Sequence, residues 1–300
     1  MQEMKEIWQN GVFTPWADAK VHVLTHALHY GDAVFEGIRA YTTQKGPAIF
    51  RLKEHMERLH YSAGVIGIKI PYSVEELCKA TTELLKRNGL SQGYIRPLAF
   101  NGYGVMGLNP TGSPVDMVIA CWPWGKYLPH ELVDIKSSKY IRIHPKSTVA
   151  DAKISGHYVN SILAVQELQG TKYHEALFLD LDGNIAEGPG ENFFMVKNGE
   201  IHTPPLGTIL AGITRNTVLQ FAKRIGVPVI ERQISLEEAC LADEAFFTGT
   251  AAEISPIRSI NDHILAKGEM GAISRQIKDA YQKMVQGEDP EFLHFLTFVD

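Results

Sequence analysis

The first third of the chain alternates apolar and polar positions in a way that predicts strands joined by short turns. Residues 6–15 are typical of a hairpin, because Asn10-Gly11 supplies the positive φ of a two-residue turn. Residues 35–52 predict two more strands, joined at Gly46-Pro47. Further β-rich runs cover residues 94–100 and 115–122.

The segment between these strands carries the signature of a capped helix. Ser73 is the expected N-cap, and Glu76, three residues on, completes a capping box. Asn88-Gly89 is the expected end of the helix. The apolar positions recur at helical spacing at Val74, Leu77, Thr81, Leu84 and Leu85.

Residues 122–131 are dense in Pro, Gly and aromatic side chains, which is typical of a connection between domains. We expect a small domain at 1–124, a linker at 125–133 and a larger domain at 134–300. In the larger domain, strands are expected near 134–144, 175–181, 192–197, 227–231 and 244–248, and helices near 157–169, 214–225 and 271–286. The elements do not alternate regularly as βαβ units, so the predicted fold class is α+β.

Composition narrows the class of protein. The 300 residues are 45% hydrophobic and 21% charged, as in ordinary globular proteins. The net charge of -5 comes without a long basic run, so neither nucleic acid nor an anionic membrane is an expected partner. Three scattered cysteines and an N-terminus without an apolar leader segment favour a cytoplasmic protein.

Two patterns suggest chemistry that the surrounding sequence does not support. Residues 102–107 match G-x-G-x-x-G, but the following Leu-Asn-Pro-Thr-Gly-Ser-Pro cannot form the helix that a dinucleotide site needs, so we expect a glycine loop. His22, His26 and His29 could bind a metal, but no acidic residue is spaced with them. Ordinary histidines in a strand and turn explain them better, and no metal site is expected.

Three segments of the second half carry a different combination of groups. Lys153 lies in VADAKISGHY, where apolar neighbours disfavour an ammonium and leave an amine for a Schiff base. Alone, a surface lysine explains it better. Glu187 and Glu191 lie in a Gly/Pro turn, AEGPGEN, which could be a solvated loop. A carboxylate there would also suit the ring nitrogen of pyridoxal phosphate.

The third segment opens a predicted helix with Ala211-Gly212-Ile213-Thr214-Arg215, and a Gly/Thr loop follows at 248–252. Backbone N–H groups at a helix start and in such a loop can bind an anion, although each could equally be an ordinary helix start and turn. Together the three segments offer an amine, a ring-nitrogen carboxylate and a phosphate site. These are the groups that pyridoxal phosphate requires.

The chain closely resembles branched-chain aminotransferases of the fold-type IV pyridoxal-phosphate class. The resemblance runs nearly from end to end of the sequence, with its motifs in the family's order. They are HALHYGDAVFEGIRAY (26–41), LKEHMERLH (52–60), YIRP (94–97), AKISGHY (152–158), EGPGEN (187–192), AGITR (211–215) and GTAAEISP (249–256). The resemblance implies a small N-terminal α/β sandwich domain and a larger C-terminal pseudobarrel domain.

The resemblance also implies a role for each matched position. Lys153 would bind pyridoxal 5'-phosphate as an aldimine, Glu187 would pair with its pyridine nitrogen and Tyr158 would hydrogen-bond its phenolic oxygen. The remaining cofactor-binding positions are Arg58, Gly190, Ile213, Thr214 and Thr250. The substrate-binding positions are Tyr30, Phe35, Tyr94, Arg96, Leu108, Thr250 and Ala251. Tyr30 and Leu108 of relatives reach across a dimer interface, which implies a homodimer or a higher homo-oligomer.

The implied reaction is ping-pong transamination between branched-chain L-amino acids and 2-oxoglutarate. Three residues have local explanations that do not need it: an exposed ion pair of Arg58 with Glu54, a rim charge for Arg96 and a core position for Tyr30. Two residues depart from the family pattern, Pro189 between the glycines and Asp32 after Tyr30-Gly31, and Asp32 could alter the preference for acidic substrates.

Other functions remain compatible with the sequence. A D-amino acid aminotransferase, an (R)-amine transaminase and an aminodeoxychorismate lyase would share the lysine, the glutamate and the phosphate site, although FEGIRAY and YIRP favour the branched-chain enzyme. A non-catalytic, cofactor-binding regulatory protein and a metal-dependent enzyme built on the histidines are alternatives of other classes.

Overall fold

The computed structural model describes residues 2–125, 127–128 and 130–299, which form two compact units. The first unit contains Met1–Gly125, Ala152–Gly156 and Lys283–Asp300, and the second contains Lys126–Asp151 and His157–Gln282. The predicted linker at 125–133 includes Lys126 and Pro129, which lie outside the described residues. The predicted domain limits stay a prediction.

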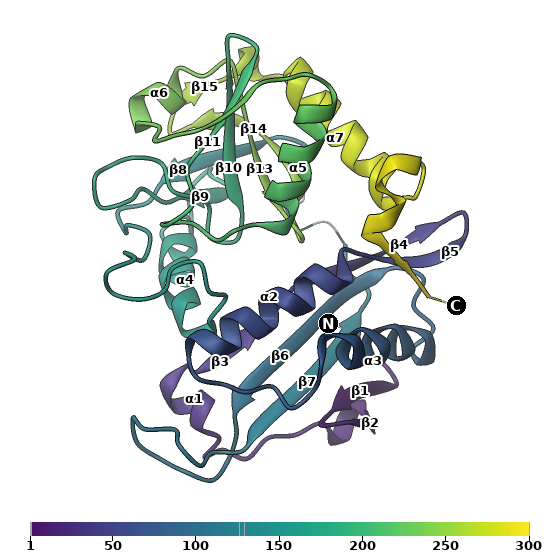
Figure 1. Ribbon diagram of the computed structural model, residues 1–300. Coiled ribbons are helices and arrows are strands. Elements are labelled where there is room, and N and C mark those ends of the chain that lie inside the picture. The colour runs from purple at the N-terminus through teal and green to yellow at the C-terminus, as the bar shows by residue number, and fades with distance from the viewer. Residues whose placement is uncertain (1, 126, 129, 300) are drawn as a thin grey trace. The chain divides into compact units, whose positions relative to one another are not determined.

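An antiparallel sheet forms the first unit, in the order β16-β5-β4-β6-β7-β1-β2, with β3 also paired to β6 (Figure 1). Its strands are β1 (Glu6–Gln9), β2 (Val12–Pro15), β3 (Ala33–Phe35), β4 (Ile38–Thr43), β5 (Gly46–Phe50), β6 (Gly93–Asn101), β7 (Val115–Trp122) and β16 (Leu296–Phe298). The hairpin predicted at Asn10-Gly11 is confirmed, since both residues have positive φ. The next hairpin turns two residues earlier than predicted, because Thr43 pairs with Gly46 and both Gly46 and Pro47 lie in β5.

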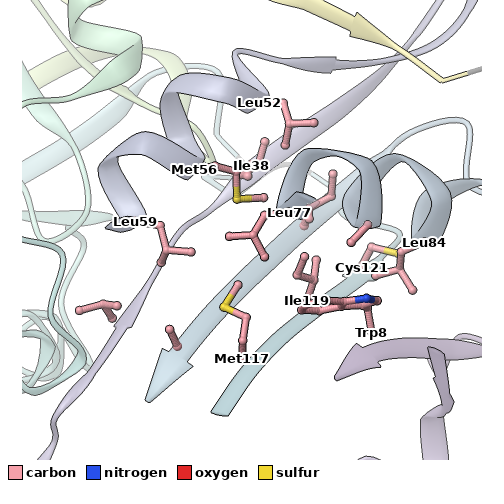
Figure 2. Close-up of a cluster of buried hydrophobic side chains, with 14 of the residues drawn as sticks. Trp8, Ile38, Leu52, Met56, Leu59, Leu77, Leu84, Met117, Ile119 and Cys121 are labelled. Atoms are coloured by element: carbon pink, nitrogen blue, oxygen red, sulfur yellow. The ribbon is translucent and has the colours of Figure 1, made fainter. Parts of the chain in front are cut away.

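Helices α2 (Leu52–Val65) and α3 (Val74–Arg87) pack on this sheet, and the unit also contains η1 (Trp16–Asp18), α1 (His26–Tyr30) and η4 (Pro290–Phe295). The capping box of Ser73 and Glu76 is confirmed, with both reciprocal hydrogen bonds present. Figure 2 shows the apolar faces of α2 and α3 meeting side chains of β7, including Ile119. Burial of this cluster, to which Ala152 and Ile154 also belong, stabilises the unit around the lysine segment.

The second unit is built on a mixed sheet in the order β12-β11-β10-β13-β14-β8-β9, with β15 paired to β14. Its strands are β8 (Val133–Ser137), β9 (Glu175–Leu177), β10 (Asn192–Lys197), β11 (Glu200–Thr203), β12 (Val229–Glu231), β13 (Glu244–Gly249), β14 (Glu253–Ile260) and β15 (His263–Ile264). Its helices are α4 (Tyr158–Gln166), α5 (Ile213–Arg224), α6 (Leu236–Cys240) and η3 (Ala266–Gly268), while η2 (Ser155–His157) and α7 (Ala272–Val285) extend into residues of the first unit.

The prediction of an α+β fold is confirmed, but β3, β11, β14, β15 and β16 were not predicted, and the strands expected at 134–144 and 175–181 were predicted too long. β14 contains Pro256, which sequence patterns rarely allow inside a sheet, and β11 is only four residues long. The strand expected at 134–144 ends at Ser137. None of the helices in the described residues combines the length and the hydropathy needed to span a bilayer.

Candidate active site

Lys153 lies in the segment Ala152–Gly156 of the first unit. Its backbone N–H donates to Ser62 Oγ on α2 at 2.9 Å, and its carbonyl oxygen accepts from the Phe35 N–H at 3.2 Å. The Nζ atom lies 5.0 Å from the centroid of the Phe35 ring. Two backbone bonds therefore fix the base of the lysine side chain, and its amine lies near an aromatic ring.

The glycine of AKISGHY allows a close approach of two backbones. Gly156 N–H donates to the carbonyl of Gly31 at 3.1 Å, and a Cβ on Gly156 would lie 3.2 Å from that same oxygen. Gly31 itself has a φ of 72°, which favours glycine. The segment that contains Lys153 is thus hydrogen-bonded to Gly31, the residue that directly follows α1.

Arg58, expected to bind the cofactor phosphate, donates from Nε to Glu36 Oε1 at 2.7 Å and from Nη2 to Glu36 Oε2 at 2.9 Å. Glu36 is 0% exposed. The alternative of an exposed Arg58–Glu54 pair is not what the structure shows, because Glu54 accepts from Arg51 Nε at 2.8 Å. Sequence reasoning missed Glu36, although an acidic residue within the apolar run of FEGIRAY was a usable signal.

His55 completes this buried group, with Nδ1 at 2.7 Å from Glu36 Oε2. Burial would raise the pKa of Glu36, but the charges and hydrogen bonds of Arg58 and His55 hold that pKa well below its usual range. Burial lowers the pKa of His55 more than the Glu36 carboxylate raises it, so a neutral imidazole donates its Nδ1–H to an ionised Glu36. The fixed carboxylate holds the guanidinium of Arg58 in one orientation.

The guanidinium of Arg96 lies between two aromatic rings. Its Cζ atom is 4.7 Å from the centroid of Phe35 and 5.4 Å from that of Tyr94, and Nη2 donates to Tyr94 Oη at 3.3 Å. A Cβ on Gly37 would lie 2.0 Å from Tyr94 Oη, so glycine is required there. Three expected substrate-binding residues, Phe35, Tyr94 and Arg96, are therefore brought together as a cation between apolar faces.

Tyr30 and Leu108 are also brought to one place, since Gly107 N–H donates to Tyr30 Oη at 3.1 Å. The core alternative for Tyr30 is wrong, because its side chain is 40% exposed. Residues 102–107 form the loop that was expected instead of a dinucleotide turn.

The N-terminal histidines differ from expectation. His26 and His29 lie in α1 rather than in a strand and turn, and His26 Nδ1 is 2.8 Å from Asp32 Oδ2. The expectation that no acidic residue is spaced with these histidines is therefore wrong for His26. In the parts of the chain that the structure describes, no three His, Cys, Asp or Glu side chains are placed to hold a metal ion.

Glu187, in the second unit, is 5% exposed and its carboxylate accepts on both oxygens. Arg142 Nε donates to Oε1 at 2.6 Å, while Leu210 N–H and Asn192 Nδ2 each donate to Oε2 at 3.1 Å. These donors favour the ionised carboxylate. Glu187 is therefore buried and hydrogen-bonded, whereas the sequence also allowed a solvated loop. Arg142 was missed because 45 residues separate the pair.

Asn192 joins two of the sequence motifs. Besides Glu187, its Nδ2 donates to the Leu210 carbonyl at 2.9 Å, just before the AGITR motif. A Cβ on Gly212, the N-cap of α5, would lie 1.9 Å from Asn192 Oδ1. Gly212 is therefore required for the start of α5, where Ile213 and Thr214 are buried, to approach the EGPGEN loop.

The third motif, GTAAE, is the turn between β13 and β14, which contains Thr250 and Ala251. A Cβ on Gly249 would lie 3.2 Å from the Gly190 carbonyl oxygen, so this turn lies against the EGPGEN loop. The hydroxyl of Thr248, buried and paired with Asn192 in the sheet, has no hydrogen-bond partner among the described residues. A buried polar atom without a partner fits a site that receives a polar ligand.

Tyr158 begins α4, one turn before Ser161. Ser161 Oγ donates to the Pro189 carbonyl at 2.8 Å, and residues three apart share a helix face, so Tyr158 lies on the side of α4 toward the EGPGEN loop. The carbonyl of Pro189, the residue that departs from the family pattern, thus accepts the hydrogen bond that holds α4 to this loop.

Comparison with known proteins places this arrangement in a family. The model of the family described as Amino-transferase class IV matches residues 33–260. The chain belongs to the class IV aminotransferases. Of its candidate cofactor residues, Lys153 and Arg58 belong to the first unit, and Glu187, Tyr158, Thr214 and Thr250 belong to the second.

Relatives of this class IV aminotransferase are similar over nearly their whole length. A branched-chain-amino-acid aminotransferase of Pseudomonas aeruginosa is 43% identical over 297 residues, which are 98% of this chain and 97% of the relative. The branched-chain aminotransferase of Thermoproteus uzoniensis, solved with norvaline, has a TM-score of 0.96 at 42% identity and covers 99% of this chain and 100% of its own. The T.th. branched-chain amino acid aminotransferase, complexed with N-(5'-phosphopyridoxyl)-L-glutamate, has a TM-score of 0.97 at 42% identity, with 100% of both chains covered.

Proposed function

We propose that this class IV aminotransferase uses pyridoxal 5'-phosphate to transfer the amino group between branched-chain L-amino acids and 2-oxoglutarate. Leucine, isoleucine and valine would be the amino donors, and L-glutamate the product of the second half of a ping-pong cycle. The names of the relatives support the substrate class, and their complexes with a phosphopyridoxyl-glutamate adduct and with norvaline support the cofactor and both kinds of substrate.

The observation that carries the proposal is the buried Glu187 carboxylate, to which Arg142, Asn192 and the Leu210 N–H donate. A pyridine ring becomes a strong electron acceptor only when its nitrogen stays protonated, and an adjacent anion keeps it so. The second unit therefore fits the ring end of pyridoxal phosphate. The start of α5 and the turn at 249–252, which both lie against the same loop, fit its phosphate end.

When bound, pyridoxal phosphate accepts the amino group and withdraws electrons from the substrate Cα, which makes the Cα proton removable. Lys153 Nζ would hold the cofactor and then carry that proton as a neutral amine. Arg58, oriented by Glu36, would contribute a positive charge toward the phosphate. Tyr158 would donate to the phenolic oxygen.

The pocket must also accept a charged and an apolar side chain in turn. Burying an unpaired carboxylate costs several kcal/mol. Arg96 can offer its guanidinium to the γ-carboxylate of glutamate, while Phe35 and Tyr94 beside it offer apolar faces to leucine. The resemblance to the family adds Leu108 and Ala251 to the apolar contacts of the substrate.

A screen of half-reactions tests the function. The protein loaded with cofactor is mixed with single L-amino acids, D-amino acids and (R)-amines, and the absorbance of the bound cofactor is followed. We expect rapid change with L-leucine, L-isoleucine, L-valine and L-glutamate. Change with D-amino acids or (R)-amines alone would instead support those transaminases, and bound cofactor that responds to no donor would support a non-catalytic protein.

We also infer a cytoplasmic homodimer or higher homo-oligomer. Leu108 of the first unit is 89% exposed, and α4 of the second unit exposes Val159, Ile162 and Val165. These are apolar positions that a second copy of the chain would cover. Sedimentation velocity on the purified protein tests this proposal, and a single monomer boundary at micromolar concentration would contradict it.

A further inference from the structure

Two residues of α1 hold the same peptide group of the loop at 102–108. His26 Nε2 lies 2.7 Å from the Gly107 carbonyl oxygen, and Tyr30 Oη accepts from the Gly107 N–H at 3.1 Å. Gly107 has a φ of 108°, a backbone conformation that residues other than glycine rarely adopt. Both the N–H and the carbonyl of Gly107, which directly precedes Leu108, are therefore held by side chains of α1.

The second nitrogen of His26 faces a carboxylate. Nδ1 lies 2.8 Å from Asp32 Oδ2, and this oxygen also accepts from Asn101 Nδ2 on β6 at 2.6 Å. A carbonyl and a carboxylate can only accept, whereas a neutral imidazole carries one N–H. Both contacts can be hydrogen bonds only when His26 is an imidazolium.

We propose that His26 and Asp32 are positioning residues, which hold the loop at 102–108 against α1 through Gly107 and thereby place Leu108 and Tyr30 for the substrate. The inference rests on the proposed function, in which Leu108 contacts the substrate, and on the substrate contact of Tyr30 that the family resemblance implies. It also gives the departure at Asp32 a role, since its carboxylate orients His26.

The arrangement makes the loop sensitive to pH. The groups that face His26 are the Asp32 carboxylate, the Tyr30 ring at 4.5 Å, the Gly107 carbonyl and, through Asp32, the Asn101 amide. The hydrogen bond to Asp32 raises the pKa of His26 above its ordinary value, against burial, which lowers it. The Gly107 bond is therefore present at low pH and is lost as pH rises through the raised pKa, because the remaining N–H stays with the carboxylate.

Three variants separate this role from a general structural one. His26→Phe keeps a ring beside Tyr30 but removes both hydrogen bonds. Asp32→Asn introduces an amide that can donate a hydrogen bond to His26 Nδ1, provided that the Asn101 amide flips so that its oxygen accepts. A neutral His26 then carries its proton on Nε2 and can still donate to the Gly107 carbonyl. His29→Phe, on the same helix, is the matched control. The hydrogen bond that the described structure gives the His29 ring is the one between Nε2 and the Val23 carbonyl, which does not involve the loop at 102–108.

Amide hydrogen exchange of residues 102–108 in the intact protein, corrected for the intrinsic effect of pH, is the first measurement. We expect exchange in the unsubstituted protein and in His29→Phe to accelerate about tenfold as pH rises through the pKa of His26, the size of a lost charge-assisted bond. His26→Phe should exchange fast at every pH, and Asp32→Asn slowly at every pH. Slow exchange in His26→Phe, or a retained transition in Asp32→Asn, would overturn the proposal.

Kinetics are the second measurement. The same pH change should raise KM about tenfold for both substrates with little change in kcat, and Asp32→Asn should abolish the rise. A change confined to kcat would place His26 outside substrate positioning. If no amino donor reacts, the proposed function fails, but the exchange experiment still decides whether His26 and Asp32 hold the loop.

Discussion

The Nε atom of Arg142 lies 2.6 Å from the Oε1 atom of Glu187, and their side chains are 12% and 6% exposed. Removing one member of a buried ion pair leaves an uncompensated charge, which costs about 3–5 kcal/mol. The Arg142–Glu187 pair is thus both a stability element and the group that would meet the cofactor ring.

A double-mutant cycle should show this coupling. Arg142→Leu is expected to lower the free energy of unfolding by about 3 kcal/mol, and Arg142→Leu with Glu187→Gln by less, because the unpaired carboxylate is gone. Urea denaturation of the cofactor-free protein measures these two variants and Glu187→Gln alone, which completes the cycle. Lys53→Met, which removes the exposed pair with Glu57, should change stability by less than about 1 kcal/mol. Additive single effects would contradict the coupling.

Glu187→Gln tests the carboxylate in catalysis. The variant should fold and bind cofactor, but proton removal from Cα should slow on the order of 10²-fold, since a preorganised charge is lost. Stopped-flow measurement of the leucine half-reaction checks this. Glu191→Gln, which alters a similarly buried carboxylate in the same loop, is the matched control. If Glu191→Gln shows the larger loss, the roles of the two glutamates must be exchanged.

Lys153→Ala should lose covalent cofactor and nearly all turnover, because the nucleophile and the proton carrier disappear together. Borohydride reduction followed by mass spectrometry detects the covalent bond. Lys146→Ala, which alters an exposed lysine of the second unit, should retain both properties. Full activity in Lys153→Ala would refute the proposed function.

Arg96→Leu should separate the two half-reactions. The loss with glutamate and 2-oxoglutarate is expected to exceed the loss with leucine by about 2–5 kcal/mol in transition-state stabilisation, because the γ-carboxylate would be buried without a partner. The two half-reactions are measured separately by single turnover. Equal losses would show that Arg96 binds the α-carboxylate that all substrates share.

Glu175 predicts a pH dependence of stability. Burial raises its pKa to about 7, above the value of an exposed glutamate. The folded protein therefore binds this proton more tightly than the unfolded chain, and stability should fall as pH rises from about 4.5 to 7, by about 3 kcal/mol in total. Glu175→Gln should remove this fall, as denaturation at about pH 5 and about pH 8 would show. The exposed Glu237→Gln should leave the pH profile unchanged.

The sequence predicted those parts of the fold that depend on neighbours along the chain. The capping box of Ser73 and the turn at Asn10-Gly11 are decided within a few residues, and both are confirmed. The partners of the candidate site are not local. Arg58 finds Glu36 across 22 residues, and Glu187 finds Arg142 across 45. Such pairings depend on which strands meet, and no single-sequence periodicity contains that information.

Family resemblance supplied positions but not the groups that hold them. Asn192 stood in a quoted motif and was given no role, because its two bonds, to Glu187 and to the Leu210 carbonyl, exist only in the folded unit. His26 was set aside as an ordinary histidine for the same reason. Buried polar residues next to candidate site positions can therefore be assigned a role only after their partners are known.

The single amide of Asn192 has a consequence for redesign of the enzyme. Its Nδ2 donates to the Glu187 carboxylate, which we propose for the cofactor ring, and to the Leu210 carbonyl, just before the helix start that we propose for the phosphate. No space is left for even a methyl group at Gly212. One side chain therefore sets the spacing between the Glu187 carboxylate and the start of α5. A substitution that adds a side chain at Gly212 would displace the Asn192 amide, so a variant designed for a longer or shorter cofactor analogue can change Gly212 only together with Asn192.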